Sequence, residues 1–188
     1  ASARLSAVLA ALIFMAGTWV LGRKLYDARA ASIGSLILAL SPLAWVTGRL
    51  LLTDIFLGVG VVWAIAGYAL ALERKDQGRN SAGGMIIAGL GLAVAMLAKG
   101  PIGVLIPLLG IVPHRALAGR AVAIGARGWA LAGGILLLLA APWFVALSVR
   151  DPSFAEFFFI HEHVLRFFTP EAHRAQPAYF YPLVLLAG

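Results

Sequence analysis

Long runs of apolar residues, one after another, constrain this chain more than any other feature. Six runs cover residues 5–22, 30–46, 50–72, 82–98, 101–112 and 129–149, and a seventh begins near residue 179. A helix needs roughly 20 mostly apolar residues to cross a bilayer. Only 12% of the residues are charged, about half the share in soluble domains. The sequence therefore predicts an all-α, polytopic transmembrane bundle of six to seven spans.

The charges of the connecting loops predict an orientation. Loops 22–30, 73–81 and 114–128 carry nine Lys or Arg against three acids, whereas the alternate connections carry five against five. Short loops rich in Lys and Arg stay in the cytoplasm, so the alternate connections should be extracytoplasmic. We expect a transmembrane domain over 1–149, an extracytoplasmic loop over 150–178 and the start of another span over 179–188. Both ends abut apolar runs, and we expect both to be truncated.

Several classes of function find no support in the sequence. The chain has no cysteine, which excludes disulfides and thiolate metal sites. Its net charge of +7 resides in short loops between spans, so nucleic acid is not an expected partner. It has no Gly-rich phosphate loop, nucleophile elbow or His-Glu-x-x-His motif. An activated donor would have to be available outside the cytoplasm, and a lipid-linked donor meets that requirement.

Two charged residues lie at the predicted outer ends of spans. Asp54 closes the sequence Arg49-Leu-Leu-Leu-Thr-Asp54, and ionisable groups at membrane depth usually face a protein interior or a water-filled cavity. The alternative is an interfacial pair between Asp54 and Arg49 that only ends the helix. Lys99 precedes Gly100-Pro101, and its compact charge suits a phosphate. The alternative is a lysine that snorkels and anchors a helix end.

The longest outer loop contains a segment with helical periodicity. Apolar residues recur at helical spacing over 154–168, which predicts an amphipathic helix in the membrane interface. Glu162 and Arg166 form a favourable i,i+4 pair. His161 and His163 suggest a divalent metal, but two residues two apart on a helix point to nearly opposite sides. A metal site is therefore disfavoured unless the helix breaks there, and no cofactor is indicated.

Five short motifs follow one another in an order that resembles a known family. They are Arg49-Leu-Leu-Leu-Thr-Asp54, Leu97-Ala-Lys99-Gly-Pro101, Pro142-Trp143-Phe144, the Phe157–Arg166 stretch, and His173 with the aromatic pair before the last span. The chain resembles lipid-carrier-dependent glycosyltransferases of the GT-C fold. This is the bacterial branch of the protein mannosyltransferase group, which includes aminoarabinose transferases that modify lipid A. The resemblance covers nearly the whole chain.

The resemblance implies an inverting glycosyltransferase in the inner membrane, with an outer cavity facing the periplasm or exterior. A polyprenyl-phosphate-linked sugar would be the donor, and lipid A, a glycan or a protein the acceptor. Asp54 would be an auxiliary catalytic acid. The family's principal acids lie in an earlier outer loop that this chain lacks, so we expect the fragment to be inactive alone. The substrate-binding residues would be Lys99, Arg49, Glu162, His163, Arg166, His173 and Tyr181.

Two other functions remain as alternatives. A transporter or flippase for a lipid-linked or anionic solute would place ionisable groups and broken helices near the membrane midplane, whereas the polar residues here gather at the outer end. A non-catalytic scaffold predicts that Asp54, Lys99 and Glu162 lie far apart. We expect Asp54, Lys99 and the Glu162–Arg166 stretch to converge on one outer cavity, because charged groups at the edge of the hydrocarbon favour a shared polar pocket. The spatial relation of these residues therefore discriminates between an enzyme and a scaffold.

Overall fold

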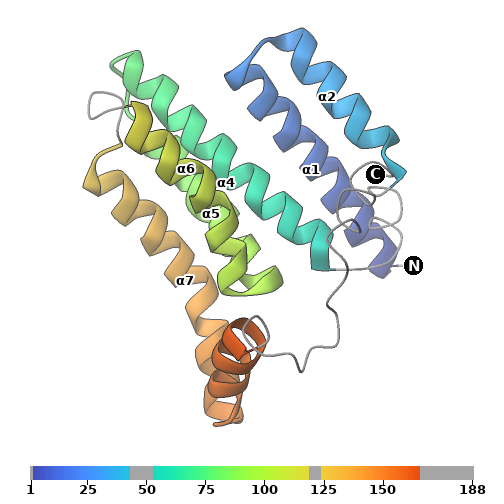
Figure 1. The fold of residues 1–188 in the computed structure, drawn as a ribbon, viewed down its shortest axis with the longest axis vertical. Helices are drawn as coiled ribbons and strands as arrows, with labels where there is room; N and C mark the ends of the chain where they lie inside the picture. The colour runs from blue at the N-terminus through green and yellow to red at the C-terminus, as the bar shows by residue number, and fades with distance from the viewer. Residues whose placement is uncertain (1, 43–52, 119–123, 166–188) are drawn as a thin grey trace.

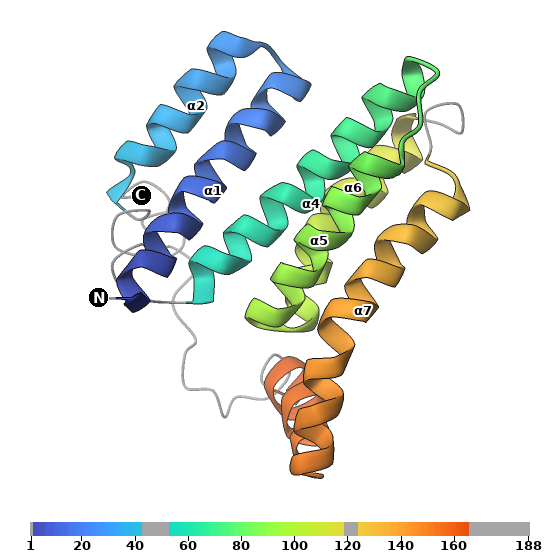
Figure 2. The same cartoon turned by 180° about the vertical axis from the view of Figure 1, so that it is seen from behind.

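The fold is built entirely from helices in the part of the chain that the computed structural model describes, residues 2–42, 53–118 and 124–165. Figures 1 and 2 show the α1–α2 hairpin beside α4, and α5 and α6 between α4 and α7. The short η1 lies beside the C-terminal end of α7. The helices are α1 (Ser2–Leu25), α2 (Ala28–Leu40), α4 (Thr53–Asp76), α5 (Ala82–Lys99), α6 (Pro101–Ala118), α7 (Ala126–Arg150) and the π-helix η1 (Glu156–Leu165).

The six helices from α1 to α7 correspond to the six apolar runs, but some of these helices are too short to cross a membrane. Four of them are long and apolar enough to cross a membrane, namely α1, α4, α5 and α7. α2 and α6 are apolar but shorter. At 1.5 Å per residue, the 13 residues of α2 cover about 20 Å. The all-α membrane fold is thus confirmed with four spans of full length, and the seventh run, from residue 179, lies outside the described residues.

The boundaries of α2 follow from local sequence signals. Asp27 caps its start, because the Asp27 carboxylate accepts a hydrogen bond from the Ala30 N–H at 2.7 Å. The predicted run continued to residue 46, but α2 ends at Leu40. Ser41 has an extended conformation, and proline disfavours a helical conformation in the residue before it. Pro42 therefore ends this helix, which explains why α2 is shorter than the apolar run.

The interior of the bundle consists mostly of small side chains, and large apolar side chains point outward. Buried positions include Ala64, Ala66, Ala88 and Ala95, whereas Leu36 and Leu138 are exposed. Water would penalise such a surface, but lipid tails are as apolar as leucine, so helices in a membrane associate through close packing of small residues. This distribution agrees with a bundle that is surrounded by lipid.

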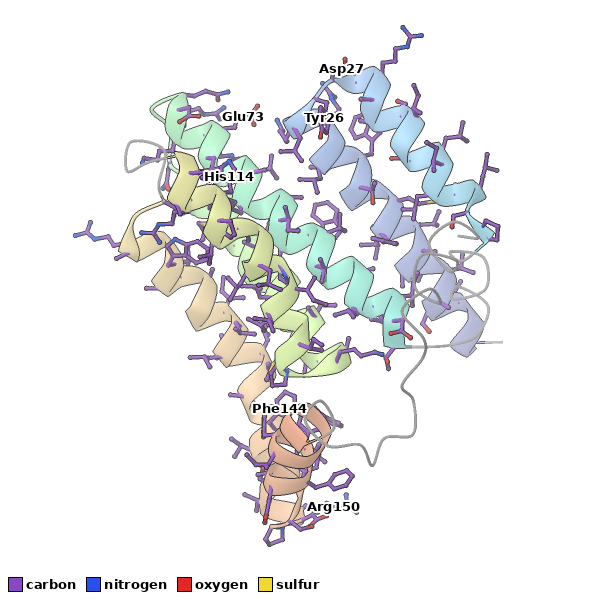
Figure 3. All side chains as sticks on the ribbon, in the orientation of Figure 1. Tyr26, Asp27, Glu73, His114, Phe144 and Arg150 are labelled. Carbon is purple, nitrogen blue, oxygen red and sulfur yellow. The ribbon has the colours of Figure 1, made fainter. Side chains whose placement is uncertain are left out.

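The connections with an excess of Lys and Arg gather at one end of the bundle. Figure 3 shows Tyr26, Asp27, Glu73 and His114 towards the upper end and Arg150 at the lower end. At the upper end, Lys24 Nζ lies 2.6 Å from Glu73 Oε2 and joins α1 to α4. We call this the basic end of the bundle. Asp54 and Lys99 belong to the opposite end, where α4 begins and α5 ends.

Candidate functional site

Asp54 lies in the first turn of α4, and α4 begins at the end of the bundle opposite the basic end (Figure 1). The first backbone N–H groups of a helix have no intrahelical acceptors, and the helix dipole places partial positive charge there. A carboxylate in the first turn is therefore stabilised as an anion.

Lys99 is the last residue of α5, at a corner where one helix stops and another begins directly. Gly100 has φ 67° and ψ −149°, a conformation that is essentially restricted to glycine, and its N–H donates to the Met96 carbonyl at 2.7 Å. Pro101 then starts α6, a position that suits proline because its missing N–H would have no partner there. The Lys-Gly-Pro sequence thus places a cation at a helix C-terminus, where the dipole favours it.

The structure brings these two residues together. Lys99 Nζ lies 2.6 Å from Asp54 Oδ1, although the residues are separated by most of two helices. The Lys99 side chain is 40% exposed and that of Asp54 is 42% exposed. Exposed ion pairs contribute only about 0–1 kcal/mol to stability. The pair is therefore a weak structural link, and both groups are accessible to a ligand.

The pairing of α4 with α5 sets the register that produces this contact. Four small residues of α4 face four of α5, and a Cβ added to Gly60, Gly67, Gly84 or Gly91 would overlap backbone atoms of the facing helix. The facing pairs are Gly60 with Ala95, Ala64 with Gly91, Gly67 with Ala88, and Ala71 with Gly84. We call these eight residues the glycine–alanine seam. In this antiparallel register, the start of α4 meets the end of α5.

η1 packs on α7 through aromatic rings. The Phe144 ring centroid lies 6.5 Å from that of Phe154, 5.4 Å from that of Phe158 and 5.7 Å from that of Phe159. The predicted amphipathic helix is thus helical over 154–165, the part of it that the structure describes, and Phe154, Phe158 and Phe159 pack on the bundle. Its type differs from the expected α-helix, because residues 156–165 form a π-helix. π-Helical segments are rare and frequently occur at functional sites.

The remaining predicted site residues are described in part or not at all. Glu162 and His163 belong to η1, where only their backbone is described. Arg49, Arg166, His173 and Tyr181 lie outside the described residues. The convergence of the Glu162–Arg166 stretch on Asp54 and Lys99 therefore stays a prediction, as do the roles of all eight predicted site residues. η1 contacts α6, the helix that follows the Lys99 corner.

In the described ranges, no group of three or more His, Asp or Glu side chains could hold a metal ion. His114 lies towards the basic end, and its ring meets Tyr68 edge-on at 5.9 Å. Tyr68 also lies against Trp129 at 5.9 Å. These three rings join α4, α6 and α7, far from Asp54 along α4. We assign them to packing.

The sequence interpretation expected Asp54 and Lys99 to converge on one outer cavity, but it named only Arg49 as a direct ion-pair partner of Asp54 and so did not predict the contact with Lys99. A signal for the contact was present. Small residues recur at spacings of four, three and four in both α4 and α5. Matching these two patterns in an antiparallel orientation places Asp54 within one turn of Lys99. The spacing of the seam residues therefore predicts the register between α4 and α5, which the charged positions alone do not.

Comparison with protein families gives an independent result. Residues 2–158 match the family described as dolichyl-phosphate-mannose-protein mannosyltransferase. This match covers most of the chain and includes Asp54, the Lys99 corner and the first part of η1.

Curated relatives and solved structures agree with one another. The chain is 28% identical over 98% of its length to the undecaprenyl phosphate-alpha-4-amino-4-deoxy-L-arabinose arabinosyl transferase of Edwardsiella ictaluri, covering 32% of that protein. It is 30% identical over 91% of its length to the Pseudomonas aeruginosa protein of the same name, covering 36% of it. The crystal structure of ArnT from Cupriavidus metallidurans bound to undecaprenyl phosphate superposes with a TM-score of 0.79 at 25% identity, over 98% of this chain and 34% of that one. The chain thus spans about a third of the length of these relatives.

Proposed function

Because the chain belongs to the dolichyl-phosphate-mannose-protein mannosyltransferase family, we propose that it forms part of a membrane glycosyltransferase with a polyprenyl-phosphate-linked sugar as donor. The relatives named above are transferases of a sugar carried by undecaprenyl phosphate, and one solved relative is bound to undecaprenyl phosphate. The acceptor would be an extracytoplasmic lipid A, glycan or protein. The enzyme would reside in the inner membrane with its site facing the periplasm or exterior.

The ion pair between Asp54 and Lys99 is the observation that supports specific roles for these two residues. In an inverting transfer, the acceptor oxygen bonds to the anomeric carbon while the bond from that carbon to the phosphate oxygen breaks. Negative charge develops on the leaving phosphate, and a fixed cation stabilises it. Lys99 is accessible and lies at a helix end, so it can supply that cation. We expect Arg166 to assist it.

A carboxylate must also take the proton of the acceptor hydroxyl. Asp54 lies 2.6 Å from the phosphate-binding candidate Lys99, so it can orient hydroxyl groups close to the breaking bond. We assign it an auxiliary role, and we expect the principal base to come from a part of the protein outside this chain. From the first turn of α4, its carboxylate oxygens can accept hydrogen bonds from those hydroxyl groups.

The test uses the full-length enzyme and compares two ion pairs of equal length. Lys99→Ala removes the proposed phosphate contact and should lower turnover at limiting donor by roughly 10- to 100-fold, because a hydrogen bond to a charged group contributes about 1.5–3 kcal/mol. Lys24→Ala breaks the 2.6 Å pair with Glu73 at the basic end and should leave turnover near the wild-type value. Asp54→Asn should slow transfer about tenfold or more while donor binding stays intact.

Each variant is first shown to insert into the membrane and to elute as the wild type does from a sizing column. Wild-type turnover of Lys99→Ala at limiting polyprenyl-phosphate sugar would refute the phosphate role, and Lys99 would then be a snorkelling anchor. Equal losses in Lys24→Ala and Lys99→Ala would assign both ion pairs to folding.

A further inference from the structure

The outer face of α1 carries a continuous apolar stripe that ends in an aromatic residue and a cation. The stripe residues follow one another at spacings of three and four, which places them on one face of the helix. They are Leu5, Leu9, Leu12, Ala16, Trp19 and Arg23, and all six are exposed. α4 packs on a different side of α1, where Gly17 approaches Val62 and Trp63. The stripe therefore faces away from α4, and at Trp19 it borders α2.

Trp19 and Arg23 form a preordered pair at the basic end of this stripe. The Arg23 guanidinium carbon lies 4.9 Å from the centroid of the Trp19 ring, and the indole N–H lies 3.4 Å from the Ser32 hydroxyl of α2. A guanidinium that stacks on an indole keeps its N–H groups available at its edge. Those groups match the oxygens of a phosphodiester. Stacking also restricts the side chain before a ligand arrives.

The charges around Arg23 leave it without a carboxylate partner among the described residues. Neighbouring Lys24 is paired with Glu73, and Asp27 accepts the capping hydrogen bond from Ala30. Arg29 adds a second cation in the first turn of α2. The hairpin between α1 and α2 therefore has an excess of positive charge beside an apolar surface.

We propose that this face binds an anionic phospholipid, with its phosphate on Arg23, its glycerol region beside Trp19 and its acyl chains along the leucines. The dimensions fit one leaflet. Ten residues separate Trp19 from Leu9, which is about 15 Å along the helix axis and about half of the ~30 Å hydrocarbon thickness. A free phosphate would meet the cation but would leave the apolar stripe uncovered. The charge, the indole and the stripe together fit a lipid of the leaflet at the basic end.

The test places the full-length protein in nanodiscs of equal parts phosphatidylcholine and phosphatidylglycerol. Lipids retained by the protein are then counted by native mass spectrometry. The wild type should retain phosphatidylglycerol preferentially, and Arg23→Gln should reduce that preference roughly fivefold, the factor expected for one cation near a membrane surface. Trp19→Leu should reduce it less, since the cation remains. Arg150→Gln removes a cation at the opposite end and should change nothing.

Arg23→Lys keeps the positive charge but loses the planar guanidinium that stacks on Trp19. A smaller loss of phosphatidylglycerol preference in Arg23→Lys than in Arg23→Gln would therefore support the proposal. Excess inorganic phosphate should not displace the lipid. The proposal would be overturned if Arg23→Gln kept the wild-type preference for phosphatidylglycerol. It would also be overturned if Arg150→Gln lost as much of that preference as Arg23→Gln. Absence of retained phosphatidylglycerol in the wild type would also overturn it, and would indicate that another protein segment covers this face. Variants are compared only when their thermal unfolding in phosphatidylcholine nanodiscs matches the wild type.

Discussion

At the scale of single residues, two glycines with positive φ determine how α5 is connected at each end. Gly78, with φ 68°, lies in the turn from α4, and Gly100, with φ 67°, joins α5 to α6. L-residues rarely adopt this conformation, because their Cβ meets the backbone. Only Gly100 adjoins a predicted site residue. The two positions therefore share a backbone requirement but differ in their distance from the proposed chemistry.

Gly100→Ala should destabilise the protein by about 1–3 kcal/mol, the usual cost of a non-glycine residue in a sparsely populated backbone conformation. It should also weaken use of the lipid-linked donor, because Lys99 is displaced with the corner. Gly78→Ala is the matched control and should cost similar stability without changing donor use. Thermal unfolding in detergent and turnover of the full-length enzyme at limiting donor measure the two effects. Equal losses of donor use would contradict a specific role for the Gly100 corner.

The sequence predicted that Asp54 and Lys99 would converge, and the structure places the two side chains 2.6 Å apart. Their charge at membrane depth indicated a site, because charged groups are costly there unless they face a protein interior or a water-filled cavity. Their mutual contact depends on the register between two helices, which no single position reveals. The roles of both residues, and of Glu162 and His163, stay predictions, because a role depends on the donor and acceptor. Arg49, Arg166, His173 and Tyr181 lie outside the described residues.

At the scale of helices, the glycine–alanine seam brings the backbones of α4 and α5 into direct contact. An added Cβ on Gly67 would overlap the Ala88 nitrogen and the Gly84 carbonyl oxygen. Backbone atoms cannot rotate away as a side chain can, so the helices must separate. The seam therefore controls both the stability of the bundle and the distance between Asp54 and Lys99.

Gly67→Ala should lower the free energy of unfolding by about 1–3 kcal/mol, as expected for overpacking of a close contact. Gly134→Ala on α7 is the control, because its added Cβ would meet nothing within 4 Å. Denaturant unfolding of the full-length protein in detergent, followed by circular dichroism, compares the two variants. A Gly67→Ala protein as stable as Gly134→Ala would show that the seam is looser than described.

The sequence predicted the existence of helices well and their details less well. Apolar runs identified all six described helices from α1 to α7, because a membrane permits little else at that hydrophobicity. The end of α2 at Leu40 could have been expected from Pro42, but the apolar composition continues past it. The π-helical form of η1 was not predicted, because a helical spacing of apolar residues does not show whether backbone hydrogen bonds span four or five residues. The contact of Phe154, Phe158 and Phe159 with Phe144 was not predicted, because helical spacing shows which residues share a face but not what that face packs against.

At the scale of the whole molecule, α4 is joined to its neighbours by an ion pair at each end. Glu73 in its last turns binds Lys24 of α1 at the basic end, and Asp54 in its first turn binds Lys99 of α5 at the other. The three connections rich in Lys and Arg share the basic end, as the alternation of loop charges predicted. The bundle is therefore electrically asymmetric along its axis, which is the property that orients membrane proteins.

This asymmetry predicts that the basic end is cytoplasmic and the Asp54–Lys99 end extracytoplasmic. Single cysteines at Ser81 and Ser153 of the full-length protein, freed of any other cysteine, should report opposite sides of the membrane. Ser81 tolerates the change because its side chain makes no capping hydrogen bond, and Ser153 follows α7 at an exposed position. A membrane-impermeant maleimide added to intact spheroplasts should label Ser153→Cys, and should label Ser81→Cys only after lysis. Labelling of both from outside would contradict the orientation, and with it the proposal that a donor reaches Lys99 from the extracytoplasmic leaflet.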